Sequence, residues 1–505
     1  MKTNTNTKKS TPFATASLVT GLSVAERGLG FLYRIVLSRL LGAEGVGLYQ
    51  VALSLFSVFL TIGTGGIPIT VSRLISKSKA ENNHKNESRA VGAGVSLCLL
   101  LTLPFALLFS LFPSSISFLF SDERCVSVFR ILILGLVFSS LYAVVRGSFW
   151  GNKQFFLPSL LELAEESVMV LCGVLLLQNV TSVTDGANRA AWAVVLSYLF
   201  SFTASVLCFF FRGGKISRPK NTLKPLFNAT LSITSVRASS SLVNSAIAVL
   251  FPAMLIRAGV GESDALRFFG ILSGMAIPVL FIPSTIVGSL ALVLVPEISE
   301  DFYRKNTARL HKNLARGLSV SALVSCFLIP FFHALGEPLG AIAFSQPLAG
   351  EFIRSGAFAL LPMSLTMIST SALNAMGFER KTFLYYFIGA AVLLLSVILL
   401  PAVCGAYAYL IGLGASFCVT AVCNLVLLSK QCKGVFRPFK IRTLHPVFRA
   451  LLLLPILCLL GSKIQTVLLH NFGQTFSLLV SAFLLLFLTA GFWFCLGLFP
   501  RRKNN

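Results

Sequence analysis

Long apolar stretches alternate with short polar segments along the whole chain. About fourteen of these stretches have the roughly 20 residues that a helix needs to cross a hydrocarbon core ~30 Å thick. The sequence therefore predicts an all-α, polytopic membrane protein with about fourteen transmembrane helices. The predicted spans cover residues 13–41, 46–72, 90–111, 126–149, 156–178, 189–211, 229–256, 267–295, 314–334, 352–376, 382–402, 406–429, 447–464 and 474–499.

Helix-breaking residues cluster inside two of these stretches, and Pro252 and Pro362 add further kinks in the seventh and tenth. Membrane helices tolerate such residues, which also allow a helix to bend, so they are compatible with a protein whose parts move. The breakers are Gly63, Gly65, Gly66 and Pro68 in the second span, and Pro278 and Pro283 in the eighth.

Composition agrees with this pattern and adds an orientation. Hydrophobic residues make up 55% of the chain and charged residues 12%, with a mean hydropathy of +0.83. A soluble chain of 505 residues would carry far more charge on its surface. The net charge of +24 comes from short basic segments between apolar stretches, which indicates membrane topology and no nucleic-acid partner. Most of the 42 lysines and arginines lie in alternate segments, so both termini are predicted to be cytoplasmic.

The second half of the chain resembles the first. RGSFWGNKQFF closes the fourth span and LNAMGFERKTF closes the tenth, and other matched segments lie at nearly the same offset. We therefore predict two six-helix lobes, a common plan for transporters with a pathway between the lobes. The predicted parts are an N-lobe (1–211), a basic cytoplasmic linker (212–228), a C-lobe (229–429), and two C-terminal helices with a cytoplasmic tail (430–505).

The first span carries charge at membrane depth. Ser23, Arg27 and Arg34 fall at helical spacing on one polar stripe, and Glu26 stands beside Arg27. A charge at the centre of a bilayer costs roughly 2.5–3.5 kcal/mol on insertion scales, so such side chains normally face a hydrated cavity or a partner. We predict that this stripe lines a cavity that binds substrate.

A second polar stripe runs along the seventh span and contains Arg237, Ser241 and Asn244. If the lobes repeat, the seventh span corresponds to the first, and each presents buried arginine to a central cavity. Serines in membrane helices also form interhelical hydrogen bonds in close packing, and for the serines alone that interpretation is favoured.

The fifth span contributes three carboxylates on one face, Glu162, Glu165 and Glu166. Adjacent carboxylates at low dielectric favour protonation of one another, so a role in coupling to H+ or Na+ is one interpretation. The other is charge balance for Arg27, Arg34 or Arg237, and Glu26 has the same two interpretations.

Signatures of enzymes and metalloproteins are missing from the sequence. It contains no P-loop, and its 11 cysteines and 5 histidines show no metal-ligand spacing. The predicted loops are under about 20 residues, too short for an independent catalytic domain. We therefore expect a transporter rather than an enzyme, with no metal or cofactor, driven by an ion gradient or the membrane potential.

The segment LGFLYRIVLSRLLGAEGVGLYQ resembles the start of stage V sporulation protein B-like proteins, and its most specific part is GAEGVGLYQ. RGSFWGNKQFFLPSLLELAEE and LVPEISEDFYRKN also match the pattern of that family. The stage V sporulation protein B-like proteins belong to the multidrug/oligosaccharidyl-lipid/polysaccharide (MOP) exporter superfamily, which includes the lipid II flippase MurJ.

The resemblance implies two lobes around a central cavity and alternating access for an undecaprenyl-pyrophosphate-linked sugar in the bacterial cytoplasmic membrane. It also implies that Arg27 and Arg34 contact the pyrophosphate, while Glu26 and the three glutamates of the fifth span depart from the family pattern. The expected partners are a lipid-linked oligosaccharide and membrane lipids, and the chain is expected to be a monomer. Two alternatives stay open: a multidrug cation antiporter of the same superfamily, and a membrane protein that binds lipid-linked intermediates without moving them.

Overall fold

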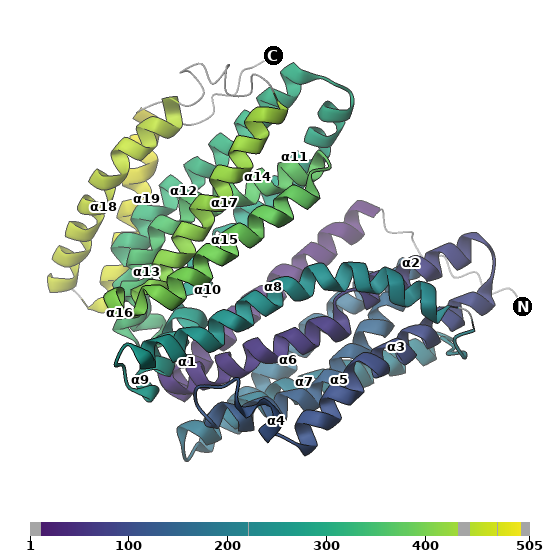
Figure 1. Ribbon diagram of the computed structural model, residues 1–505. Helices are drawn as coiled ribbons and strands as arrows, with labels where there is room; N and C mark the ends of the chain where they lie inside the picture. The colour runs from purple at the N-terminus through teal and green to yellow at the C-terminus, as the bar shows by residue number, and fades with distance from the viewer. Residues whose placement is uncertain (1–11, 221, 433–444, 472, 496–505) are drawn as a thin grey trace, which may run out of the picture. The chain divides into compact units, whose positions relative to one another are not determined.

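The computed structural model describes the chain except residues 1–11, 221, 433–444, 472 and 496–505 (Figure 1). The described part contains helices and no strand, which confirms the all-α prediction. The chain divides into two compact units, Met1–Val249 and Leu250–Asn505, called unit 1 and unit 2 below. The predicted lobe boundaries stay predictions.

Unit 1 contains seven complete helices and the first part of an eighth within its described residues. These are α1 (Pro12–Thr64), α2 (Ile67–Ala80), α3 (His84–Leu111), α4 (Ser114–Ser117), α5 (Arg124–Gly151), α6 (Phe156–Leu176), α7 (Val183–Phe211) and α8 (Leu223–Arg257). The 3₁₀ turn Leu177–Asn179 follows α6.

Unit 2 contains the rest of α8 and the helices that follow it. These are α9 (Glu262–Phe269), a π-helical segment (Gly270–Ala276), α10 (Ile277–Leu280), α11 (Ser284–Tyr303), α12 (Thr307–Phe344), α13 (Pro347–Gly356), a 3₁₀ turn (Ala357–Ala359), α14 (Leu360–Ala375), α15 (Glu379–Leu399), α16 (Pro401–Cys404), α17 (Tyr407–Gln431), α18 (His445–Asn471) and α19 (Gln474–Cys495).

Eleven helices among the described residues are long and apolar enough to cross a membrane, which confirms a polytopic membrane protein. The count of fourteen spans stays a prediction. The first two predicted spans fall within one helical stretch, Leu18–Ala80, and the last corresponds to the shorter apolar helix Thr475–Gly491. α6 is not one of these eleven helices, because the glutamates of the fifth predicted span interrupt its apolar sequence.

α1 bends sharply at Gly42, between the first two predicted spans. A straight helix of 53 residues would be about 80 Å long, far more than a bilayer is thick. Gly42 has φ 68 and ψ 177, a conformation that a side chain disfavours, and it divides α1 into two helices. This explains why glycine opens the GAEG segment.

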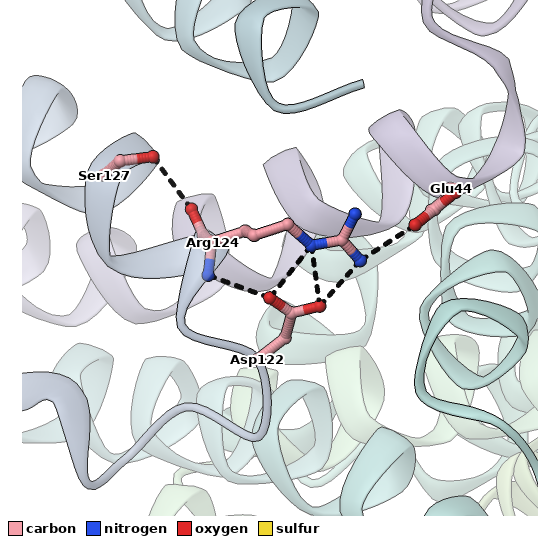
Figure 2. A network of polar contacts seen from close by, with 4 residues as sticks. All are labelled: Glu44, Asp122, Arg124 and Ser127. Carbon is pink, nitrogen blue, oxygen red and sulfur yellow. Dashed lines mark hydrogen bonds and ion pairs between the residues drawn. The ribbon is translucent and has the colours of Figure 1, made fainter. Parts of the chain in front are cut away.

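A network of polar contacts holds the residues just after this bend (Figure 2). The Arg124 guanidinium contacts Glu44 Oε1 at 2.8 Å and Asp122 Oδ2 at 2.7 Å, and the Asp122 carboxylate also accepts from the backbone N–H of Arg124 at 2.8 Å. The Ser127 hydroxyl donates to the Arg124 carbonyl at 2.9 Å and to Asn188 Oδ1 at 3.0 Å. The network thus fastens the bend of α1 to the start of α5 and to α7.

The predicted breaks in the second and eighth spans are confirmed. α1 ends at Thr64 and α2 begins at Ile67, so the glycine-rich segment interrupts the helix. In unit 2, α10 ends at Leu280 and α11 begins at Ser284, immediately after Pro283.

α5 packs against α1, α2, α3 and α7 of unit 1. Its close approach to α2 depends on Gly147, where a Cβ atom would lie 2.7 Å from the carbonyl oxygen of Pro68. Around this contact lies an apolar core that includes Ile67, Val71 and Val144.

In unit 2, α12 packs against several helices in the same way and contacts α11, α13, α14, α18 and α19 (Figure 1). The two C-terminal helices, α18 and α19, therefore lie against α12. Leu459 of α18 and Phe483 of α19 are 66% and 70% exposed, as expected for apolar side chains that face lipid.

Candidate functional site

Three helices of unit 1, α1, α5 and α6, bring together a cluster of charged side chains, called the N-terminal charged cluster below. α6 packs against both α1 and α7, and α5 packs against α1 and α7. Residues far apart in sequence thereby become neighbours within one unit. The cluster consists of Glu26, Arg27 and Arg34 on α1, Arg146 on α5, and Glu162, Glu165 and Glu166 on α6.

The direct ion pair of this cluster joins α5 to α6. Arg146 Nη1 lies 2.6 Å from Glu162 Oε1, and each side chain is 24% exposed. The Arg146 guanidinium also lies 5.6 Å from the ring centre of Tyr142 and 5.2 Å from that of Trp150. The three residues follow at intervals of four on α5, so the arginine is held between two aromatic rings on one helix face.

The other two glutamates of α6 have different surroundings. Charges on Glu162, Arg146 and Glu166 act on Glu165, which also lies beside Ser201 of α7. Glu166 lies against α1, where a Cβ atom at Gly30 would be 2.8 Å from its Oε1 atom. Gly30 therefore leaves the space that the Glu166 carboxylate occupies.

The charges on α1 take part in the same cluster. Glu26 is half-buried and interacts electrostatically with Glu162, Arg27 and Arg146. Glu166 in turn interacts with Glu26 and with Arg34. Residues 26 and 34 therefore lie on the side of α1 that faces α6, as does Gly30 between them.

The two arginines of α1 differ from Arg146 in their pairing. Arg27 and Arg34 are both exposed, and no acidic side chain of the described residues lies within 4.0 Å of either guanidinium. Their positions differ by seven residues, which is two helical turns, so they share one face of α1. The structure therefore leaves two exposed guanidinium groups beside a partly buried group of carboxylates.

The polar stripe of the seventh predicted span lies on α8. The Ser241 hydroxyl is 2.8 Å from the Thr61 hydroxyl of α1, and a second hydroxyl pair at 2.8 Å joins Thr230 to Thr70 of α2. These bonds fasten α8 to the junction of α1 and α2, so part of the stripe serves helix packing.

The other predicted residues of the stripes remain accessible. Arg237 and Asn244 of α8 are exposed, and Ser23 of α1 is half-buried. No contact with the described residues ties Arg237 to the N-terminal charged cluster, although both belong to unit 1.

Arg146 is the member of the cluster that the sequence did not identify. It falls near the end of the fourth predicted span, 126–149, and α5 continues as helix to Gly151. The signal for its position was the spacing of Tyr142, Arg146 and Trp150, which aligns two aromatic residues with one arginine. Among the described residues there is no group of His, Cys, Asp and Glu that could hold a metal ion.

Residues 14–302 match the family described as polysaccharide biosynthesis protein. A curated relative, the stage V sporulation protein B of Bacillus subtilis (strain 168), is 25% identical over 346 residues. That alignment covers 65% of this chain and 66% of the relative, just under two thirds of the relative's length.

Two solved structures have similar folds. The lipid II flippase MurJ in an inward closed conformation is 15% identical, with a TM-score of 0.67 over 95% of this chain and 99% of that chain. A multidrug resistance MATE family transporter of the MOP superfamily, in an inward-facing conformation, is 13% identical, with a TM-score of 0.67. That match covers 84% of this chain and 99% of the transporter, and both likenesses concern the fold.

Proposed function

The chain belongs to the polysaccharide biosynthesis protein family, and on that premise we propose that it is an alternating-access flippase or exporter. Its substrate is an undecaprenyl-pyrophosphate-linked peptidoglycan or polysaccharide precursor, which it moves across the bacterial cytoplasmic membrane. The fold likeness to MurJ, named a lipid II flippase, and the relationship to a sporulation protein support this assignment.

The proposal rests on the exposure of Arg27 and Arg34 and on their lack of an acidic partner. Both guanidinium groups are exposed, share one face of α1, and lack an acidic partner within 4.0 Å among the described residues. Guanidinium groups stay charged when desolvated and bind phosphate oxygens through paired, charge-assisted hydrogen bonds. We assign these two arginines to the pyrophosphate of the substrate.

Four further residues complete the proposed cavity. Arg237 supplies a third guanidinium group, and Asn244 and Ser23 supply accessible hydrogen-bonding groups for a sugar. Ser241 already bonds to Thr61, so its contribution requires that α8 separate from α1 during transport.

We assign the carboxylates of the N-terminal charged cluster to coupling. Arg146 pairs directly with Glu162, which leaves Glu26, Glu165 and Glu166 without a direct ion pair among the described residues. Carboxylates held together at low dielectric bind a proton or a sodium ion readily, because either ion reduces their mutual repulsion. We therefore propose H+ or Na+ as the driving ion.

A multidrug cation antiporter is the second candidate function. The four carboxylates of the N-terminal charged cluster favour cationic substrates, and the fold is similar to that of a MATE family transporter. In that case the carboxylates bind substrate and Arg27 is dispensable. A third candidate, a membrane protein that binds lipid-linked intermediates without moving them, predicts binding without translocation.

The test is transport by the purified chain in liposomes, with a fluorescent undecaprenyl-pyrophosphate-linked sugar in one leaflet. Arg27→Gln and Arg34→Gln should each weaken substrate binding roughly tenfold to a hundredfold, the effect of losing a charge-assisted hydrogen bond. Arg130→Gln, at an exposed arginine of α5, is the matched control and should transport normally.

A second substrate separates the candidates. The same lipid with a monophosphate should be moved more slowly, since it offers fewer oxygens to the two arginines. Normal transport by the Arg27→Gln/Arg34→Gln double variant would refute the pyrophosphate site. Export of organic cations that requires Glu165 but neither arginine would establish the antiporter instead.

A further inference from the structure

Unit 2 contains a cavity that the proposed function does not use. It has a volume of about 390 Å³ and lies between α12, α13 and α18. Polar side chains from all three helices line it: Glu337 of α12, Arg354 of α13, and Ser462, Gln465 and Thr466 of α18. The rest of its wall is largely apolar and includes Pro338 and Leu469.

An ion pair forms the charged side of this cavity. Arg354 donates through Nη1 to Glu337 Oε1, and the two side chains are 42% and 53% exposed. None of the described residues accepts a hydrogen bond from the other guanidinium nitrogens of Arg354. The arginine thus keeps most of its donors available for a ligand.

The helices that carry this pair are fixed closely to one another. A Cβ atom at Gly340 of α12 would lie 2.2 Å from the backbone nitrogen of Gly350 of α13, so the two backbones are in direct contact. His333 Nδ1 also lies 3.3 Å from the Arg354 carbonyl oxygen. The charged side of the cavity therefore has a rigid support.

Gln465 also lines the cavity, and its amide is only partly hydrogen-bonded. The residue is 5% exposed, its Nε2 donates to the Ser477 hydroxyl at 3.3 Å, and its Oε1 has no partner among the described residues. A hydroxyl can donate or accept, so either orientation of the amide leaves one end unpaired. Burying an unpaired polar atom is unfavourable, and a ligand with a complementary group would offset that cost.

The cavity lies near the ends of two helices. Glu337 is seven residues from the end of α12 and Gln465 is six residues from the end of α18, which is roughly 10 Å along each helix. The cavity therefore lies nearer to one end of each helix than to its middle. Leu469 of α18, which lines the cavity, is 43% exposed and offers an apolar surface to acyl chains.

We propose that this cavity binds the headgroup of a membrane phospholipid. The phosphate accepts hydrogen bonds from the unused guanidinium nitrogens of Arg354, and an amine or hydroxyl of the headgroup pairs with Glu337 and with the free end of the Gln465 amide. The acyl chains lie along the apolar face of α18. This site lies within unit 2 and does not depend on the assignment of Arg27 and Arg34.

Native mass spectrometry of the full chain in detergent tests the proposal, with phosphatidylethanolamine or phosphatidylglycerol added at defined concentrations. The wild type should retain one phospholipid tightly. Arg354→Gln should weaken that binding roughly tenfold to a hundredfold through loss of charge-assisted hydrogen bonds. Gln465→Leu, which removes the unpaired amide but no charge, should weaken it by roughly fivefold to tenfold.

Arg267→Gln is the matched control, because Arg267 is an exposed arginine of unit 2 that pairs with Asp264 at 3.9 Å outside the cavity. It should bind lipid as the wild type does. Lipid binding equal to that of the wild type, in whichever of Arg354→Gln and Gln465→Leu remains folded, would overturn the proposal. Equally tight binding of soluble phosphoethanolamine or glycerol phosphate would also overturn it, since the ligand would then be a free phosphate ester.

Discussion

Replacing Arg146 with glutamine removes the positive partner of Glu162 from the N-terminal charged cluster. The ion pair is short, at 2.6 Å, and each side chain is 24% exposed, so the site lies between a surface pair and a fully buried one. Exposed pairs contribute up to about 1 kcal/mol, whereas removing one partner of a buried pair costs about 3–5 kcal/mol. We expect Arg146→Gln to destabilise the protein by roughly 2–4 kcal/mol, because Glu162 then faces other carboxylates without a direct partner.

Thermal unfolding of the purified protein in detergent measures this effect. For a unit of about 250 residues, a loss of 2–4 kcal/mol corresponds to a fall in Tm of roughly 5–10 °C. Glu162→Gln alone should cost less, since the arginine it leaves behind keeps its contacts with Tyr142 and Trp150. The Arg146→Gln/Glu162→Gln double variant should be more stable than Arg146→Gln, because no uncompensated carboxylate remains at position 162.

The double variant also provides the refutation. If the two single effects simply add, with a coupling below about 0.5 kcal/mol, the ion pair does not stabilise the cluster and the argument fails. A coupling of roughly 1.5–3 kcal/mol would agree with a close, partly buried charge pair.

Two further predictions concern the packing and the bend of unit 1. Gly147→Ala should destabilise the protein by roughly 1–3 kcal/mol, because the new Cβ atom would meet the backbone of Pro68. The control is Gly28→Ala, at a glycine of α1 whose Cβ position has nothing within 4 Å. It should be neutral or slightly stabilising in the same Tm measurement. A Tm equal to the wild type for Gly147→Ala would contradict the close contact of α2 and α5. Arg124→Gln should increase hydrogen exchange around the GAEG bend, since it releases both carboxylates of Figure 2, whereas Arg130→Gln should leave that exchange unchanged. Equal protection of the bend in both variants would argue against its fastening by Arg124.

The helices and their breaks could be predicted because they depend on local sequence. A run of apolar residues long enough for a membrane forms a helix wherever it lies, and glycine or proline interrupts it at its own position. The interruptions at residues 65–66 and 281–283 illustrate this, as does the bend at Gly42 in the gap between two predicted spans. The number of spans is harder to predict, since α6 combines a span's length with three charges.

The partners within the site could not be predicted, because they depend on which helix faces pack together. The spacing of Glu162, Glu165 and Glu166 indicates a shared face, yet the three carboxylates interact with different helices. The polar stripe of α8 had two interpretations, a cavity lining and helix packing. Ser241 serves helix packing, because it bonds to Thr61, while Asn244 remains exposed. Such distinctions arise from contacts between residues 180 positions apart, as in that serine–threonine pair.

The ion pair of Arg146 with Glu162 favours the coupling interpretation of the glutamates over charge balance for the α1 arginines. If the carboxylates only balanced the charge of the α1 arginines, their direct ion pairs should involve Arg27 or Arg34, but the one within 4.0 Å among the described residues involves Arg146. Arg34 still acts on Glu166 at longer range, so an anion bound to Arg34 would remove part of the charge that stabilises that carboxylate. Binding of a pyrophosphate at α1 and uptake of a cation at α6 would then favour each other, as thermodynamic linkage requires. In this arrangement Arg34 links the anionic substrate to Glu166, and Arg27 links it to Glu26. Arg34→Gln should therefore reduce the dependence of substrate affinity on the concentration of the driving ion, while the control Arg130→Gln preserves it.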